Sequence, residues 1–156
     1  MPVGITSYGS YVPRYRIRSD EIARVWGDDA NIGRALKVLS KSVPGPDEDV
    51  ATISVQAARQ AMARAQTPAS DIGAIYVGTE SHPYAVKPTG PVVQAAIGAG
   101  PYLTMADYGL ACQPGPASSH HRRAHVKSGL CRPVTAIRRA ARRAAPTHTL
   151  CVPPST

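Results

Sequence analysis

A carboxylate and a thiol follow two apolar segments of the chain and are the side chains best suited to chemistry. Glu80 comes two residues after the apolar run that ends at Gly78, and Cys112 ends the apolar segment 106–111. A thiolate can be acylated and then released, while a nearby carboxyl group moves a proton at the carbon under attack. The pair therefore indicates covalent acyl transfer. Taken alone, a cysteine in an apolar stretch is more often a small buried hydrophobic residue, and a glutamate in a loop is often simply solvated.

The first half of the chain contains strand and helix patterns. Residues 3–12 alternate loosely and are rich in tyrosine and β-branched residues, which predicts a strand closed by Pro13. Ser19 predicts the N-cap of a short amphipathic helix that ends near Gly27. A longer helix is expected over 50–66, preceded by acidic residues. Small and branched residues form a stripe along it that suits close packing on a sheet: Ile53, Ala57, Ala61 and Ala65.

The following segment predicts the centre of the fold. The unbroken apolar run 72–77 is typical of a strand buried on both faces. A helix over 92–97 and a strand over 106–111 then lead to Cys112. Strands alternating with helices in this way indicate an α/β fold with a mixed central sheet.

Four segments, in the same order, carry a resemblance to a known family. They are GITSYGSYVPRYRI (4–17), KVLSKSVPGPDEDVATISVQAAR (37–59), IGAIYVGTESHPYAVKPTG (72–90) and ADYGLAC (106–112). They resemble the amino-terminal part of archaeal-type hydroxymethylglutaryl-CoA synthase, a thiolase-fold condensing enzyme. The run from Glu80 to Pro88 is too long and idiosyncratic to arise by chance. The resemblance implies a partial thiolase-like fold, with an amino-terminal half domain over 1–112 and a divergent tail over 113–156, in a chain that is a fragment.

The resemblance also implies roles for the site residues. Cys112 takes the place of the nucleophile that accepts an acetyl group from acetyl-CoA. Glu80 takes the place of the general acid/base that removes a proton from the acetyl methyl group, so that this carbon attacks the ketone of acetoacetyl-CoA in the mevalonate route to isoprenoids. We expect the Glu80 carboxylate to be buried near Val77 and Tyr84. His82, Tyr84 and Lys87 share its loop and are candidate substrate-binding residues.

Further implications concern cofactors and partners. CoA thioesters are expected as substrates, with no cofactor and no metal. The family's catalytic histidine lies in the half that is absent, and no motif assigns its role to a histidine of the tail: His120, His121, His125 or His148. The family also implies a homodimer that associates with an acetoacetyl-CoA thiolase and a small OB-fold protein. We expect a cytoplasmic protein, since neither a signal peptide nor a long apolar run is present.

The tail differs in composition from the rest. The formal net charge is +8, and all ten acidic residues precede Cys112, together with ten of the 18 basic ones, so the whole excess lies in the tail. Pro116 is poorly suited to a helix after Cys112. We expect 113–156 to be irregular or disordered, either as a genuine basic tail or as a sequence disrupted by a shift of reading frame. Three cysteines without CxxC spacing support neither a disulfide framework nor a zinc site.

Two other functions remain open. One is another condensing enzyme of the same fold, such as a ketoacyl-acyl-carrier-protein synthase III, although the loop 81–84 argues against it. The other is a non-catalytic remnant whose basic tail binds anions. Nucleic acid is not expected as a partner, because the first 112 residues are balanced in charge.

Overall fold

The computed structural model describes residues 6–29, 31–109, 132–136 and 147–152. Their helices and strands follow in this order: β1 (Tyr15–Arg18), α1 (Ser19–Trp26), α2 (Ile32–Ala35), β2 (Ser40–Val43), α3 (Val50–Ala65), the short 3₁₀ helix η1 (Ala69–Asp71), β3 (Ala74–Gly78), α4 (Thr89–Ile97), β4 (Thr104–Tyr108), β5 (Arg132–Ala136) and β6 (Thr147–Val152). None of the helices in these ranges is long and apolar enough to cross a membrane.

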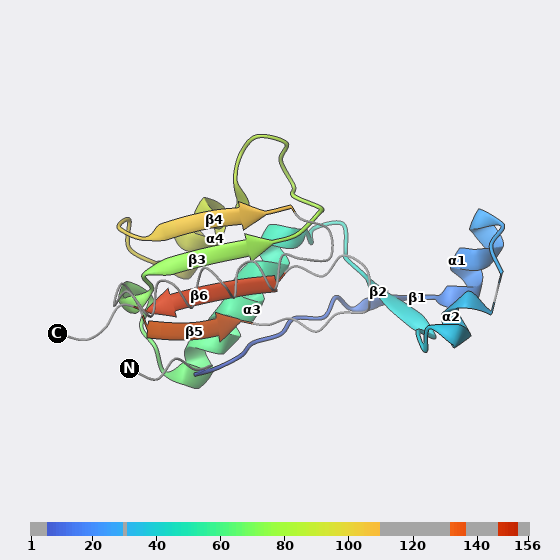
Figure 1. Ribbon diagram of the computed structural model, residues 1–156, viewed down its shortest axis with the longest axis horizontal. Coiled ribbons are helices and arrows are strands. Elements are labelled where there is room, and N and C mark those ends of the chain that lie inside the picture. The colour runs from blue at the N-terminus through green and yellow to red at the C-terminus, as the bar shows by residue number, and fades with distance from the viewer. Residues whose placement is uncertain (1–5, 30, 110–131, 137–146, 153–156) are drawn as a thin grey trace.

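A mixed sheet of β4-β3-β6-β5 forms the body of the molecule, and α3 and α4 cover one of its faces (Figure 1). β3 pairs with β4 in parallel, whereas β6 pairs antiparallel with both β3 and β5. The predicted α/β fold with a mixed sheet is confirmed. The expectation that 113–156 is irregular is wrong for two segments, because β5 and β6 belong to the sheet.

The core lies on both sides of β3, whose residues are all buried. Ile75 and Val77 face the two helices and pack with Val55, Ala58, Val93 and Ile97. Ala74 and Tyr76 face the other way and pack with Ala106 and Tyr108 of β4. A strand with apolar side chains on both faces must be covered on both, as the unbroken apolar run predicted.

The described part of the segment 3–12 is not a strand, which corrects the sequence prediction. Residues 6–12 are extended and lie along α3. The Ser7 hydroxyl donates to the Ala61 carbonyl at 2.7 Å, and Gly9 lies so close that a β-carbon there would fall 2.0 Å from the Ala57 carbonyl oxygen. Ala57 and Ala61 of the predicted stripe therefore lie against this extended backbone and not against the sheet. Val55 and Ala58 of α3 pack with β3 instead, which corrects the prediction.

Helix α3 begins and ends as its sequence predicts. The Asp49 carboxylate accepts the Thr52 N–H at 2.7 Å, and the Thr52 hydroxyl accepts the Asp49 N–H at 2.8 Å, which completes a capping box. Gln66 ends the helix in a left-handed conformation, φ 51°. Helix α4 begins at Thr89, three residues earlier than expected, and β4 spans 104–108 in place of the predicted 106–111.

The hairpin of β1 and β2 carries α1 and α2 away from the sheet (Figure 1). Ser19 was expected to cap α1, but Arg18 holds the N-cap position and the Ser19 hydroxyl donates to the Leu39 carbonyl at 3.2 Å. Gly27 ends the helix at φ 72°, as predicted. The apolar side of α1 is exposed, and 78% of the Trp26 surface is accessible.

Candidate active site

The two residues predicted to do chemistry follow adjacent parallel strands. Gly78 of β3 is in register with Tyr108 of β4, so both strands end at the same edge of the sheet. Glu80 lies two residues beyond the end of β3, and Cys112 lies four residues beyond the end of β4. The chain segments that carry them therefore start side by side. Cys112 itself lies outside the described residues.

Thr79 fixes the start of the Glu80 loop. Its N–H donates to the Tyr108 carbonyl at 2.9 Å, and its hydroxyl accepts the Ser81 N–H at 3.0 Å. Only 2% of Thr79 is exposed. The expectation that Glu80 is buried is wrong, because residue 80 is exposed between these two bonded neighbours. The turn that buries Thr79 directs the next residue outward.

The side chain of His82 contacts Thr89 and Asp107, with which it forms a partly buried cluster. Its Nδ1 lies 2.9 Å from the hydroxyl oxygen of Thr89 and 3.7 Å from a carboxylate oxygen of Asp107. The Asp107 carboxylate accepts the backbone N–H groups of Thr89 and Gly90, the first two residues of α4. An anion at this position satisfies N–H groups that have no partner within the helix. Asp107 and Thr89 were not identified from the sequence.

Tyr84 and Lys87 lie in the exposed part of the same loop. The Lys87 ammonium is 5.7 Å from the centre of the Tyr84 ring, a cation–π distance. Both residues are exposed. Of the three candidate substrate-binding residues, His82 is bonded to the cluster, whereas Tyr84 and Lys87 are exposed and contact each other.

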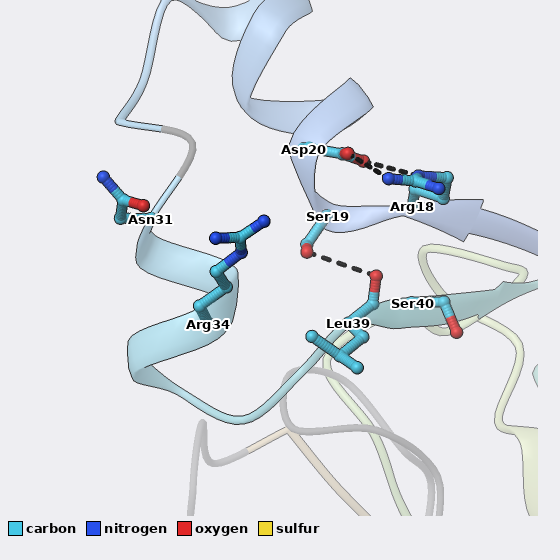
Figure 2. Close-up of a pocket in the computed structure, with 7 residues that line it drawn as sticks. All are labelled: Arg18, Ser19, Asp20, Asn31, Arg34, Leu39 and Ser40. Carbon is cyan, nitrogen blue, oxygen red and sulfur yellow. Dashed lines mark hydrogen bonds and ion pairs between the residues drawn. The ribbon is translucent and has the colours of Figure 1, made fainter.

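A polar cavity of about 520 Å³ lies where the β1–β2 hairpin carries α1 and α2, away from the ends of β3 and β4 (Figure 2). Its lining residues are Arg18, Ser19, Asp20, Asn31, Arg34, Leu39 and Ser40. Arg18 makes two bonds to Asp20, one of them 2.9 Å long, and holds the pKa of that carboxyl at about 2. Arg34 extends from α2 toward Ser19 (Figure 2), and no described carboxylate pairs with it. The sequence had given no sign of this cavity.

Metal ligands do not gather at either place. Within the described ranges, no group of three or more histidine, cysteine, aspartate or glutamate residues is arranged to hold a metal ion. The chemistry available to the described site is that of a carboxylate, an imidazole and a helix N-terminus.

None of the protein-family models compared with the chain matches it. Solved structures do match it closely in fold. The 3-oxoacyl-[acyl-carrier-protein] synthase III of Aquifex aeolicus VF5 has a TM-score of 0.81 and 16% identity, over 99% of this chain and 55% of its own. MvaS in complex with 3-hydroxy-3-methylglutaryl coenzyme A has a TM-score of 0.77 and 22% identity, over 96% of this chain and 40% of its own. The chain therefore has the fold of the thiolase-like condensing enzymes.

Sequence similarity is more specific. The hydroxymethylglutaryl-CoA synthase of Picrophilus torridus is 59% identical over 129 residues, which are 81% of this chain and 36% of that protein. The enzyme of the same name from Methanosarcina barkeri is 56% identical over 131 residues, 83% of this chain and 38% of that protein. The resemblance to archaeal hydroxymethylglutaryl-CoA synthases is thereby confirmed, and the chain spans just over a third of the length of these curated relatives.

Proposed function

We propose that this chain carries the acetyl-transfer part of a hydroxymethylglutaryl-CoA synthase, an acyltransferase that condenses acetyl-CoA with acetoacetyl-CoA. The observation that carries the proposal is the 59% identity over 81% of the chain to a relative of that name. Two structural neighbours also hold ligands of the right chemistry, one 3-hydroxy-3-methylglutaryl coenzyme A and the other CoA. CoA thioesters are then the substrates.

The reaction begins with covalent transfer. The Cys112 thiolate attacks the carbonyl carbon of acetyl-CoA, a new sulfur–carbon bond forms, and CoA leaves with its sulfur. The Glu80 carboxylate then takes a proton from the methyl group of the acetyl-enzyme. The resulting carbanion attacks the ketone carbon of acetoacetyl-CoA, and the ketone oxygen takes up a proton. Water finally cleaves the enzyme thioester, which releases the product and restores the thiol.

The geometry supports the pairing of these two residues. β3 and β4 are parallel and in register, so the segments leading to Glu80 and to Cys112 leave from one edge of the sheet. Glu80 is exposed and free to meet a substrate, while Thr79 and His82 on either side of it are bonded to the body of the fold. A reactive group on a loop held at both ends suits proton transfer, which depends on position.

A second candidate is a condensing enzyme like ketoacyl-acyl-carrier-protein synthase III. The TM-score to such an enzyme, 0.81, is slightly higher than the 0.77 to MvaS. At 16% identity this similarity describes the fold and says little about the substrate. The two candidates differ in the thioester that condenses with the acyl-enzyme, which is a CoA thioester for one and an acyl-carrier-protein thioester for the other.

Intact-protein mass spectrometry after incubation with acetyl-CoA tests the proposal. We expect the chain to gain one acetyl group, Cys112→Ala to gain none, and the control Cys131→Ala to behave as the parent chain. Absence of acetylation in the parent chain would refute the transfer activity and favour a non-catalytic remnant. Efficient condensation with malonyl-acyl-carrier protein would favour the second candidate.

Glu80 is tested separately from Cys112. Glu80→Gln should still be acetylated, because the carboxylate acts after the acetyl group has been transferred. Exchange of the acetyl methyl protons with deuterated solvent should fall by about a hundredfold or more, the contribution of a general base. Equal exchange in the parent chain and in Glu80→Gln would remove the proposed role.

The resemblance supports two partner proposals as well. We propose that the chain self-associates as a dimer, and that it binds an acetoacetyl-CoA thiolase and a small OB-fold protein. Light scattering of the purified chain tests the first, and co-purification with the two purified proteins tests the second. A monomer at all concentrations, or no co-purification, would contradict the respective proposal.

A further inference from the structure

The Asp107 carboxylate joins three elements at the edge of the sheet where Glu80 lies. It stands on β4, accepts the N–H groups of Thr89 and Gly90 at the start of α4, and lies 3.7 Å from His82 in the loop after β3. Gly90 permits this approach, since a β-carbon there would fall 3.3 Å from a carboxylate oxygen of Asp107. The side chain of Asp107 is only 16% exposed. Because a buried charge is costly without partners, these N–H groups and His82 must stabilise the carboxylate.

Thr89 completes the cluster. It is fully buried, and its hydroxyl oxygen lies 2.9 Å from Nδ1 of His82. A hydroxyl can either donate or accept, so this contact alone leaves the tautomer of the imidazole open. The nearby Asp107 carboxylate decides between the two. A lone pair on Nδ1 would face a negative charge, whereas a proton there is attracted to it.

The ring of His82 should therefore carry its proton on Nδ1 and donate it to Thr89. Its Nε2 then holds the lone pair. Since the second nitrogen of a histidine takes its state from the hydrogen bond that the first one makes, Asp107 and Thr89 set both the orientation and the tautomer of the ring.

The same bonds hold the loop. Thr79 is bonded to Tyr108 at one end of the turn, and His82 is bonded to Thr89 at the other, so Glu80 sits on a short span tied down at both ends. We propose that Asp107 and Thr89 are positioning residues, which act through His82 to fix the backbone that carries Glu80. The proposal deepens the proposed function and rests on it for the role of Glu80. The state of the His82 ring is independent of that role.

Nuclear magnetic resonance of the chain labelled with ¹⁵N-histidine tests the ring directly. The His82 signals are identified by their loss in His82→Gln, and the measurement is made at a pH of about 8.5, above the ordinary histidine pKa of about 6.5. We expect the Nδ1–H tautomer in the parent chain and in Thr89→Ser, which keeps the hydroxyl. Asp107→Asn should shift the ring toward Nε2–H, while Asp28→Asn, at an exposed carboxylate, should leave it unchanged.

Either of two results would overturn the proposal: an Nε2–H ring in the parent chain, or no change of tautomer in Asp107→Asn. Thr89→Ser is the control for a substitution within the cluster, because serine keeps the hydroxyl that contacts His82. These results do not depend on any reaction of the chain.

Proton exchange links the ring to Glu80. In Asp107→Asn we expect acetylation of Cys112 to persist and exchange of the acetyl methyl protons to slow by roughly tenfold to a hundredfold, as for a misplaced catalytic group. Unchanged exchange despite an altered tautomer would show that the cluster does not position Glu80. Absence of acetylation in the parent chain would count against the proposed function, and the tautomer experiment would still decide the state of the cluster.

Discussion

The N–H of Thr79 donates to the carbonyl of Tyr108 at 2.9 Å and continues the contact between β3 and β4 beyond the last residue of β3. The bond ties the first residue of the Glu80 loop to the strand that leads toward Cys112. The Thr79 hydroxyl adds a second tie by accepting the Ser81 N–H at 3.0 Å. The backbone on both sides of Glu80 is thus bonded through one buried threonine.

Replacing Thr79 by valine should destabilise the chain by about 1 kcal/mol. Valine has nearly the same shape but offers no acceptor, so the partly buried Ser81 N–H loses its partner. The change is measured by urea unfolding. Thr104→Val, at an exposed position of β4, is the matched control and should change the free energy of unfolding by less than about 0.5 kcal/mol. Equal midpoints for the two variants would contradict the role given to the hydroxyl.

Gly9→Ala should cost about 1 to 3 kcal/mol, the range for overpacking in a well-packed interior. The new β-carbon would lie 2.0 Å from the Ala57 carbonyl oxygen and 2.7 Å from the Ala61 nitrogen, and these are backbone atoms of α3 that cannot swing aside. Thermal unfolding measures the loss. Gly100→Ala is the control, because a β-carbon at residue 100 meets nothing within 4 Å. A stable Gly9→Ala variant would show that the extended segment does not lie on α3.

Asp49→Ala should destabilise α3 by about 1 kcal/mol, since the carboxylate accepts the otherwise unpaired Thr52 N–H at 2.7 Å. Asp49→Asn keeps an acceptor at the same position and should retain most of the stability. Helix content by circular dichroism during urea unfolding provides the measurement, with Asp28→Ala as the exposed control. If Asp49→Asn lost as much as Asp49→Ala, the charge would matter more than the hydrogen bond.

The elements that the sequence predicts well are those whose signal is local. The apolar run of β3 and the acidic residues before α3 predict these elements without any knowledge of distant contacts, and both elements lie where they were expected. The segment 3–12 shows the limit. Ser7 and Gly9 are buried while Thr6 and Tyr8 are exposed, so the period of two is real. This alternation indicates an extended backbone with one buried face. It does not show whether that face packs against a strand or, as observed, against a helix.

The prediction that the tail is irregular is wrong at β5 and β6 for a different reason. Its many arginines led to the expectation of disorder, yet the segment of β6 reads Thr-His-Thr-Leu-Cys-Val and has the β-branched content of a strand. Average composition over 113–156 concealed this short pattern. β6 pairs between β3 and β5, and so joins residues far apart in the sequence. A local sequence pattern cannot predict such a pairing.

One further site residue, Asp107, has a signal in the sequence. Asp107 stands within an apolar strand pattern, and a carboxylate in such a place needs a partner inside the protein. That signal marks Asp107 for attention but does not name the start of α4, 17 and 18 residues away, as the partner. Glu80 was placed correctly on a loop after β3, and its exposure depends on the turn made by Thr79, which only the fold reveals.

The stability of the chain should fall at high pH because of Tyr76. Burial, with a smaller contribution from Tyr108, raises the pKa of Tyr76 to about 12 from an ordinary value of 10.0. The neutral phenol is the form that the fold favours, so its contribution is complete below about pH 10 and is lost as the pH rises toward 12. We expect the free energy of unfolding, measured in urea, to decline over this interval. Tyr76→Phe cannot ionise at this position and should decline less, whereas Tyr102→Phe, at a residue that is 97% exposed, should follow the parent chain. Parallel curves for the parent chain and Tyr76→Phe would mean that the Tyr76 ring is not held in the core next to Tyr108.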